Sequence, residues 1–148
     1  WEVENLYDVC FTYTRLSLSS YRLRENAKPI SDLCFVERDE TKNLIAAIRY
    51  WPIKIRNHPS ILLGPIAVHP TREWDWHARY IINHSLKEAE LLGWEVVILI
   101  GDLSYYQQFN FNIAENLNFP QPTNKKRILI KSLNRFNTDE LKGTINKY

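Results

Sequence analysis

Residues 62–111, LLGPIAVHPTREWDWHARYIINHSLKEAELLGWEVVILIGDLSYYQQFNF, contain the pattern that decides the fold. The run Ile61–Val68 is apolar on both faces, which is typical of a central strand. Over Glu73–Leu92 the apolar residues recur at intervals of three and four, which predicts a long helix. Gly93 suits the position just after its end, and Glu95–Ile100 is a second buried strand. A strand, a helix and a strand in this order predict two parallel neighbouring strands.

The flanking segments add strands and helices to this unit. Before it, the sequence predicts a helix at Glu2–Phe11, a second short helix from Ser17–Ser20 to about Glu25, strands at Ile30–Val36 and Leu44–Pro52, and turns at 37–43 and 57–59. After it, the sequence predicts a short helix with Tyr105 and Tyr106, a loop at Phe119–Pro122, a basic turn at Asn124–Arg127 and a strand at Arg127–Leu133. The two strands before the unit form an antiparallel hairpin, so we expect a mixed sheet with helices on both faces, in the α/β or α+β class.

One domain, residues 1–148, accounts for the whole predicted pattern, because 148 residues suit a single core. We expect 44–52, 61–68 and 95–100 to be adjacent strands, with the last two parallel and the helix crossing between them. The chain contains no Met, so we expect further residues to precede Trp1 in the natural protein.

Composition excludes several classes of protein. Apolar residues make up 45% of the chain and charged residues 24%, which excludes a disordered protein. The net charge is +2, too small for the basic field of a non-specific nucleic-acid binder. No apolar run approaches the roughly 18–20 residues of a membrane span, and two cysteines make neither a disulfide scaffold nor a multi-cysteine metal site. A cytoplasmic protein with no membrane or nucleic-acid partner is the expectation.

The same central block resembles the GNAT acetyltransferases, and most closely a bacterial subgroup with the motifs LGPxAVHP and GDxxYYxRFGF. These are matched here by LGPIAVHP, residues 63–70, and GDLSYYQQFNF, residues 101–111, and the resemblance covers roughly residues 2–145. It implies a mostly antiparallel twisted sheet in which the parallel central pair splays apart. It also implies that the backbone of Ile66, Ala67 and Val68 binds the pantetheine arm of acetyl-CoA.

The loop after this strand departs from the family pattern. In the family, a glycine-rich loop and the N-terminus of the long helix hold the pyrophosphate of acetyl-CoA. The resemblance places Arg72, Trp76, His77, Ala78 and Arg79 at or beside these positions. There is no glycine from residue 71 to 92; two indoles and two carboxylates, those of Glu73, Trp74, Asp75 and Trp76, stand there instead. Bulky side chains keep a backbone away from phosphates and carboxylates repel them, so we expect weak binding of acetyl-CoA or none.

Tyr106 matches the family tyrosine that protonates the departing thiolate of CoA. A phenol with a pKa of about 10 is a suitable acid for a thiolate of about 8.5, although Tyr105, Tyr106, Phe109 and Phe111 also suit a core. No general base is evident. His69 suits a structural role in the loop, and Asp102 suits either the N-cap of the short helix or a contact with the substrate amine. His58, His77 and His84 lack metal-ligand spacing, so we expect no metal.

Three functions remain open from the sequence. The first is an acetyl-CoA-dependent N-acetyltransferase that transfers acetyl directly to a primary amine of a small-molecule or peptide acceptor. The second is a GNAT-fold binding or regulatory module that has weakened or lost its affinity for CoA. The third is an enzyme that takes another acyl donor in a pocket lined by Trp74 and Trp76. The intact central strand and Tyr106 favour the first function, and the glycine-poor loop favours the second.

Overall fold

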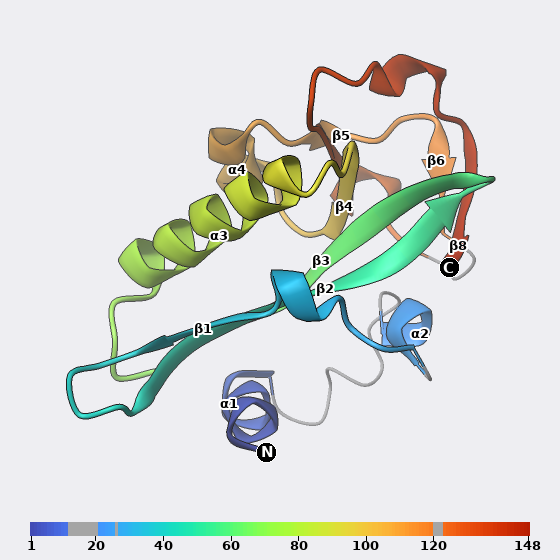
Figure 1. Ribbon diagram of the computed structural model, residues 1–148. Coiled ribbons are helices and arrows are strands. Elements are labelled where there is room, and N and C mark those ends of the chain that lie inside the picture. The colour runs from blue at the N-terminus through green and yellow to red at the C-terminus, as the bar shows by residue number, and fades with distance from the viewer. Residues whose placement is uncertain (12–20, 26, 120–122) are drawn as a thin grey trace.

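The computed structural model describes residues 1–11, 21–25, 27–119 and 123–148 (Figure 1). Its helices are α1 (Glu2–Phe11), α2 (Tyr21–Arg24), α3 (Trp74–Leu91) and α4 (Leu103–Tyr106), with 3-10 turns η2 (Ser31–Leu33), η3 (Gln107–Phe109), η4 (Lys125–Arg127) and η5 (Thr138–Glu140). Its strands are β1 (Phe35–Arg38), β2 (Leu44–Ile55), β3 (His58–Val68), β4 (Val96–Ile100), β5 (Asn112–Ile113), β6 (Leu117–Asn118), β7 (Ile128–Ser132) and β8 (Gly143–Lys147). The predicted cap at Ser17–Ser20 and part of the loop at Phe119–Pro122 lie outside the described residues.

The strands form one curled sheet in the order β5-β7-β4-β3-β2-β8-β6, with β1 added beside β2. Strands β5 and β6 stand at opposite ends of this order although Ala114–Asn116 alone separates them in the sequence, so the sheet must curl. The pairs β2–β3 and β4–β7 are antiparallel and β3–β4 is parallel. The prediction of a mixed sheet, with β2, β3 and β4 adjacent and the long helix crossing between the parallel strands, is therefore confirmed.

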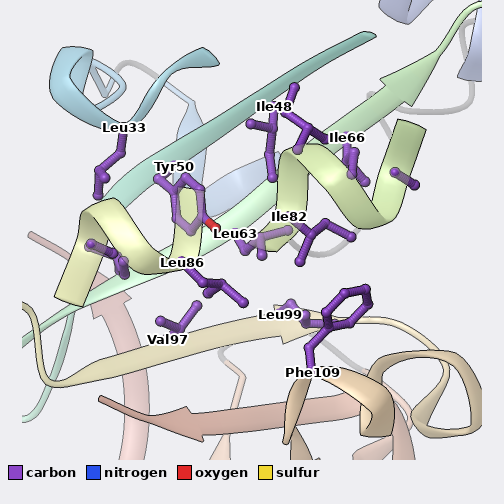
Figure 2. Close-up of a cluster of buried hydrophobic side chains, with 14 of the residues drawn as sticks. Leu33, Ile48, Tyr50, Leu63, Ile66, Ile82, Leu86, Val97, Leu99 and Phe109 are labelled. Atoms are coloured by element: carbon purple, nitrogen blue, oxygen red, sulfur yellow. The ribbon is translucent and has the colours of Figure 1, made fainter. Parts of the chain in front are cut away.

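Helices cover both faces of the sheet. On one face, α3 places Ile82, Leu86 and Ala89 against Leu63 and Ile66 of β3 and against β4 (Figure 2). On the other face, Leu6 and Tyr7 of α1 cover Ala47 and Ala67, and Trp51 belongs to a further apolar cluster with Leu23 and Leu62. Burying these faces is the main favourable term for folding. The predicted arrangement of helices on both faces is confirmed.

Several element boundaries differ from the sequence prediction. Residues Ile30–Val36 are not one strand: Ser31–Leu33 form a 3-10 turn and the strand begins at Phe35. It continues to Arg38, because the Asp39 carboxylate accepts hydrogen bonds from the backbone N–H groups of Thr41 and Asn43 and so closes the turn later than predicted.

The next predicted turn, at residues 57–59, was also misplaced. Ile55 pairs with His58, so the turn consists of Arg56 and Asn57, with Arg56 at φ 55°. A non-glycine residue is uncommon in this left-handed region, and an arginine there gives no turn signal in the sequence. The short strands β5, β6 and β8 were missed as well, because two to five residues are too few to show a period.

The ends of α3 agree closely with the prediction. Glu73 occupies the N-cap position and Leu92 the C-cap position, and Gly93 follows at φ 90°. That φ favours glycine, which is why the helix ends here. Five residues, 69–73, thus connect the end of β3 to the start of α3, and this short connection places the helix start beside the end of the central strand.

Candidate active site

The central feature of the site is an open backbone edge on β3. Strand β3 pairs with β4 at Ile61 and Leu62 only, and it continues for six residues beyond that point. Over Ile66, Ala67 and Val68 its other edge pairs with Ile48, Ala47 and Ala46 of β2. The side chains of the three β3 residues are buried, so what they offer on the β4 side is backbone. Such an edge can accept an extended, amide-containing ligand as an added strand.

The start of α3 supplies further backbone donors. No side-chain hydrogen bond from Glu73 caps the helix, and the backbone N–H of His77 donates to the Glu73 carbonyl at 3.4 Å. The first-turn N–H groups of Trp74, Asp75 and Trp76 therefore precede the intrahelical ladder. Together with the positive end of the helix dipole they favour an anion. The donors lie slightly earlier in the chain than the resemblance implied, since the N–H of His77 is already used within the helix.

The cationic and imidazole side chains proposed for phosphate binding are engaged elsewhere. Arg72 pairs with Asp39 at 2.7 Å, and His77 Nδ1 lies 2.7 Å from Oε1 of Glu37. Both contacts tie the start of α3 to β1 and its turn. Arg79 pairs with Asp75 at 3.1 Å, one helical turn away. Arg72 and Arg79 are thus each paired with a carboxylate, and a bound anion would have to compete with those carboxylates for them.

The two indoles of the loop take different directions. Trp76 stacks on Tyr80, with ring centroids 5.8 Å apart, and its side chain is exposed along α3. Trp74 instead contacts Tyr105 of α4, with ring centroids 5.0 Å apart. Because α3 follows the end of β3 and α4 follows the end of β4, this contact bridges the ends of the two diverging strands. Ala78 is fully buried against the sheet and offers no side-chain contact to a ligand.

Tyr106 lies half-buried on α4. Its ring contacts those of Tyr105, Phe109 and Phe111, and a Cβ on Gly101 would lie 2.6 Å from it. Burial, and then the charge of Asp102, raise the pKa of Tyr106 to about 12. The tyrosine therefore stays protonated at neutral pH and can donate a hydrogen bond.

Tyr105 was not singled out by the sequence, because two adjacent tyrosines give no signal of which one faces a site. Its hydroxyl oxygen is buried and has no hydrogen-bond partner among the described residues. Burial, and then the charge of Asp75, raise its pKa to about 12. A buried hydroxyl without a partner is costly unless a ligand or water satisfies it, which makes Tyr105 a second candidate donor beside the start of α3.

Two residues that the sequence left open have structural partners. His69 Nδ1 lies 2.8 Å from the Thr71 hydroxyl, and the His69 backbone N–H donates to the Ile45 carbonyl, so this histidine holds the loop. Asp102 occupies the N-cap position of α4 but makes no side-chain cap bond. Its carboxylate pairs with Arg127 at 2.7 Å instead, so the predicted capping role was wrong.

The described residues contain neither a group of metal-binding side chains nor a helix suited to span a membrane. Within residues 1–11, 21–25, 27–119 and 123–148, no three histidine, cysteine or acidic side chains are grouped so that they could hold a metal ion. Of the helices in this same part of the chain, none is both long enough and apolar enough to span a membrane.

The curled mixed sheet, its diverging parallel pair and the helix that begins at the end of the central strand match the GNAT fold of solved structures. A solved structure with this fold is the GNAT-family N-acetyltransferase YhbS from Escherichia coli in complex with CoA, which is 18% identical over 99% of this chain and 83% of its own, with a TM-score of 0.83. A GNAT-family acetyltransferase from Brucella melitensis in complex with acetyl-CoA gives a TM-score of 0.70 at 18% identity, over 99% of this chain and 88% of its own.

A more distant neighbour is Naa20 from Chaetomium thermophilum in complex with a bisubstrate analogue, with a TM-score of 0.60 at 14% identity over 93% of this chain and 86% of its own. No protein-family model matches the sequence, and comparison with curated proteins finds no match. The similarity to the solved structures is one of fold.

Proposed function

We propose that this chain is an acetyl-CoA-dependent N-acetyltransferase that transfers acetyl directly to a primary amine of a small-molecule or peptide acceptor. The observation that carries the proposal is the open edge of β3 over Ile66–Val68, followed directly by the uncapped N-terminus of α3. Solved neighbours with this fold contain CoA or acetyl-CoA. We also propose, as the sequence predicts, that the protein is bacterial and cytoplasmic.

The residues present fit the donor in two parts. The backbone of Ile66, Ala67 and Val68 would hold the amide-containing arm, and the first-turn N–H groups of α3 would hold the pyrophosphate. In the first part, the edge is unpaired toward β4, but the Val68 carbonyl already accepts a hydrogen bond from the Cys10 thiol at 3.2 Å, which a ligand at that carbonyl would have to replace. The second part fits less well, because Glu73 and Asp75 place negative charge beside the phosphates.

Acetyl-CoA would supply the acetyl thioester, and the chain would orient it and manage protons. The acceptor nitrogen forms the new bond to the acetyl carbon, the carbon–sulfur bond breaks, and the proton lost by the amine balances the proton gained by the CoA sulfur. A phenol with a pKa of about 12 holds its proton more tightly than a thiol of about 8.5. We therefore assign Tyr106 the role of donating a hydrogen bond to the leaving sulfur, with the net proton coming from solvent.

The alternative is a GNAT-fold binding or regulatory module with little affinity for CoA. The observations that favour it are the Trp74–Tyr105 contact between α3 and α4 and the engagement of Arg72 and Arg79 by carboxylates. Under this alternative the loop has become a structural connection to β1.

Calorimetric titration with acetyl-CoA and with CoA separates the two functions. Saturable binding, together with release of free CoA thiol in the presence of a panel of primary amines, supports the enzyme, and the acetylated amine is then identified by mass spectrometry. No binding heat up to millimolar acetyl-CoA from a folded protein would overturn the enzyme proposal and leave the binding module.

A further inference from the structure

A bulge in β3 separates the part of the strand that pairs with β4 from the open edge. Tyr50 of β2 pairs with Leu63 and Ile48 pairs with Ile66, so Gly64 and Pro65 lie opposite the single residue Arg49. A bulge of this kind bends the strand and increases its twist. It begins two residues after Leu62, the last residue paired with β4. The geometry of the bulge therefore sets the direction in which the open edge leaves β4.

Two aromatic side chains from other elements hold the carbonyl groups of this bulge. The indole N–H of Trp51 donates to the Gly64 carbonyl at 2.7 Å, and the hydroxyl of Tyr7 donates to the Pro65 carbonyl at 3.3 Å. Trp51 is 8% exposed and Tyr7 is fully buried. Gly64 has a φ of 129° and Pro65 has no N–H, so the regular ladder cannot continue through this point. The two side chains take the place of strand partners.

Tyr7 is itself held in place by its neighbours. The guanidinium of Arg49 lies over its ring, 5.2 Å from the centroid, and Arg49 pairs with Glu4 of α1. The residue of β2 opposite the bulge thus also anchors the helix that reaches the bulge. Helix α1, β2 and β3 are joined at one point by contacts that span 45 to 58 residues of sequence.

We infer that Trp51 and Tyr7 are positioning residues for the acetyl donor: by fixing the Gly64–Pro65 bulge they aim the backbone of Ile66–Val68 at it. This inference rests on the proposed function. If either donor is removed, a partly buried carbonyl loses its partner, which is unfavourable, and the bulge can shift. Hydrogen bonds from a backbone edge to a ligand are sensitive to such shifts because they weaken steeply with distance and angle.

The test compares three variants that each remove one hydrogen-bond donor and keep an aromatic ring. Tyr7→Phe and Trp51→Phe remove the donors to the bulge. Tyr50→Phe is the matched control, because Tyr50 is fully buried and its hydroxyl lies 2.8 Å from that of Ser85 on the opposite, α3-covered face. Tyr7→Phe and Tyr50→Phe are the same chemical change at two buried sites, so any general loss of stability is shared by both.

Calorimetry with CoA is the first measurement. We expect the Kd for CoA to rise about five- to tenfold in Tyr7→Phe and Trp51→Phe, and to stay within about twofold in Tyr50→Phe. Equal effects in all three variants would reduce Trp51 and Tyr7 to ordinary core residues and overturn the inference. An unchanged Kd in Tyr7→Phe and Trp51→Phe would overturn it as well.

Amide hydrogen exchange of Ala67, which pairs with Ala47 of β2, is the second measurement and is made without ligand. We expect faster exchange in Tyr7→Phe and Trp51→Phe than in Tyr50→Phe after the global stability of each variant is matched. If the wild-type protein does not bind CoA, the proposed function fails and the exchange result alone decides whether the two side chains fix the bulge. Equal exchange in the three variants would then refute that placement.

Discussion

Replacing Glu73 and Asp75 by Gln and Asn should tighten the binding of acetyl-CoA. Glu73 occupies the N-cap position of α3 and Asp75 lies in its first turn, beside the N–H groups assigned to the pyrophosphate. Two unit charges ~4 Å apart repel by about 4 kcal/mol at an effective dielectric of ~20. Both side chains are exposed, so solvent and salt reduce this to about 1 kcal/mol for each.

The structure makes the two contributions unequal. Asp75 already pairs with Arg79 at 3.1 Å, so part of its charge is neutralised and its removal frees a cation. Glu73 has no ion pair among the described residues. We therefore expect the single change Glu73→Gln to lower the Kd about fivefold and the double change to lower it about tenfold or more.

Stability should change in the opposite direction. Carboxylates in the first turn of a helix interact favourably with its dipole, by about 0.3–1 kcal/mol each. The double variant should therefore unfold more easily than the wild type while it binds acetyl-CoA more tightly. A variant that was simply less well folded would bind acetyl-CoA more weakly, so lower stability together with tighter binding is specific to this explanation.

The assay is calorimetry with acetyl-CoA at low and at high salt, with urea unfolding in parallel. The gain in affinity should shrink at high salt, because the repulsion is screened. Glu90→Gln is the control, since Glu90 is exposed on the same helix about 22 Å further along it than Asp75. An unchanged Kd in the double variant, or an equal gain in Glu90→Gln, would show that the start of α3 does not hold the phosphates.

Three further predictions follow from the site. Trp74→Ala should speed the association of acetyl-CoA in stopped-flow measurements, because it removes the contact with Tyr105 that bridges the ends of β3 and β4. Trp76→Ala should not, because the Trp76 indole stacks on Tyr80 instead. Equal effects of the two variants would contradict this prediction. Tyr106→Phe should lower kcat about 10²-fold with little change in the KM for acetyl-CoA, because it removes the hydrogen bond to the leaving sulfur. A pKa of about 12 means that Tyr106 adds no inflection to the kcat profile of the wild type between pH 6 and 9; full retained activity would leave Tyr106 a core residue. Hydrogen bonds from Thr41 and Asn43 lower the pKa of Asp39 from its ordinary 3.8 to about 2, so Asp39 stabilises the fold above about pH 4 and loses this contribution as the pH falls to about 2. The urea midpoint of Asp39→Asn should therefore depend less on pH in that interval than the midpoint of the wild type. Equal pH dependence of the two midpoints would contradict this prediction.

The sequence alone determined the order and type of the main elements. The apolar run of Ile61–Val68, the helical stripe before Gly93 and the buried run before Gly101 are local patterns, and each records which face of its own segment is buried. Buried positions recur with the period of the helix or strand, so they can be recognised in the sequence without knowledge of the elements that cover them. That information was enough for the parallel pair, the crossing helix and the mixed sheet.

The tertiary structure alone decided how the site is arranged. The pairing of β3 with β4 ends at Leu62. Arg72 and His77 form contacts with acidic side chains that lie 33 and 40 residues away in the sequence. Trp74 contacts Tyr105 on another helix. A side chain chooses its partner by distance and direction in space, and no period in the sequence encodes a contact between distant segments. The sequence therefore identified the residues of the loop. Which of them already contact other side chains of the protein depended on the fold that brings α1, β1 and α4 around β3.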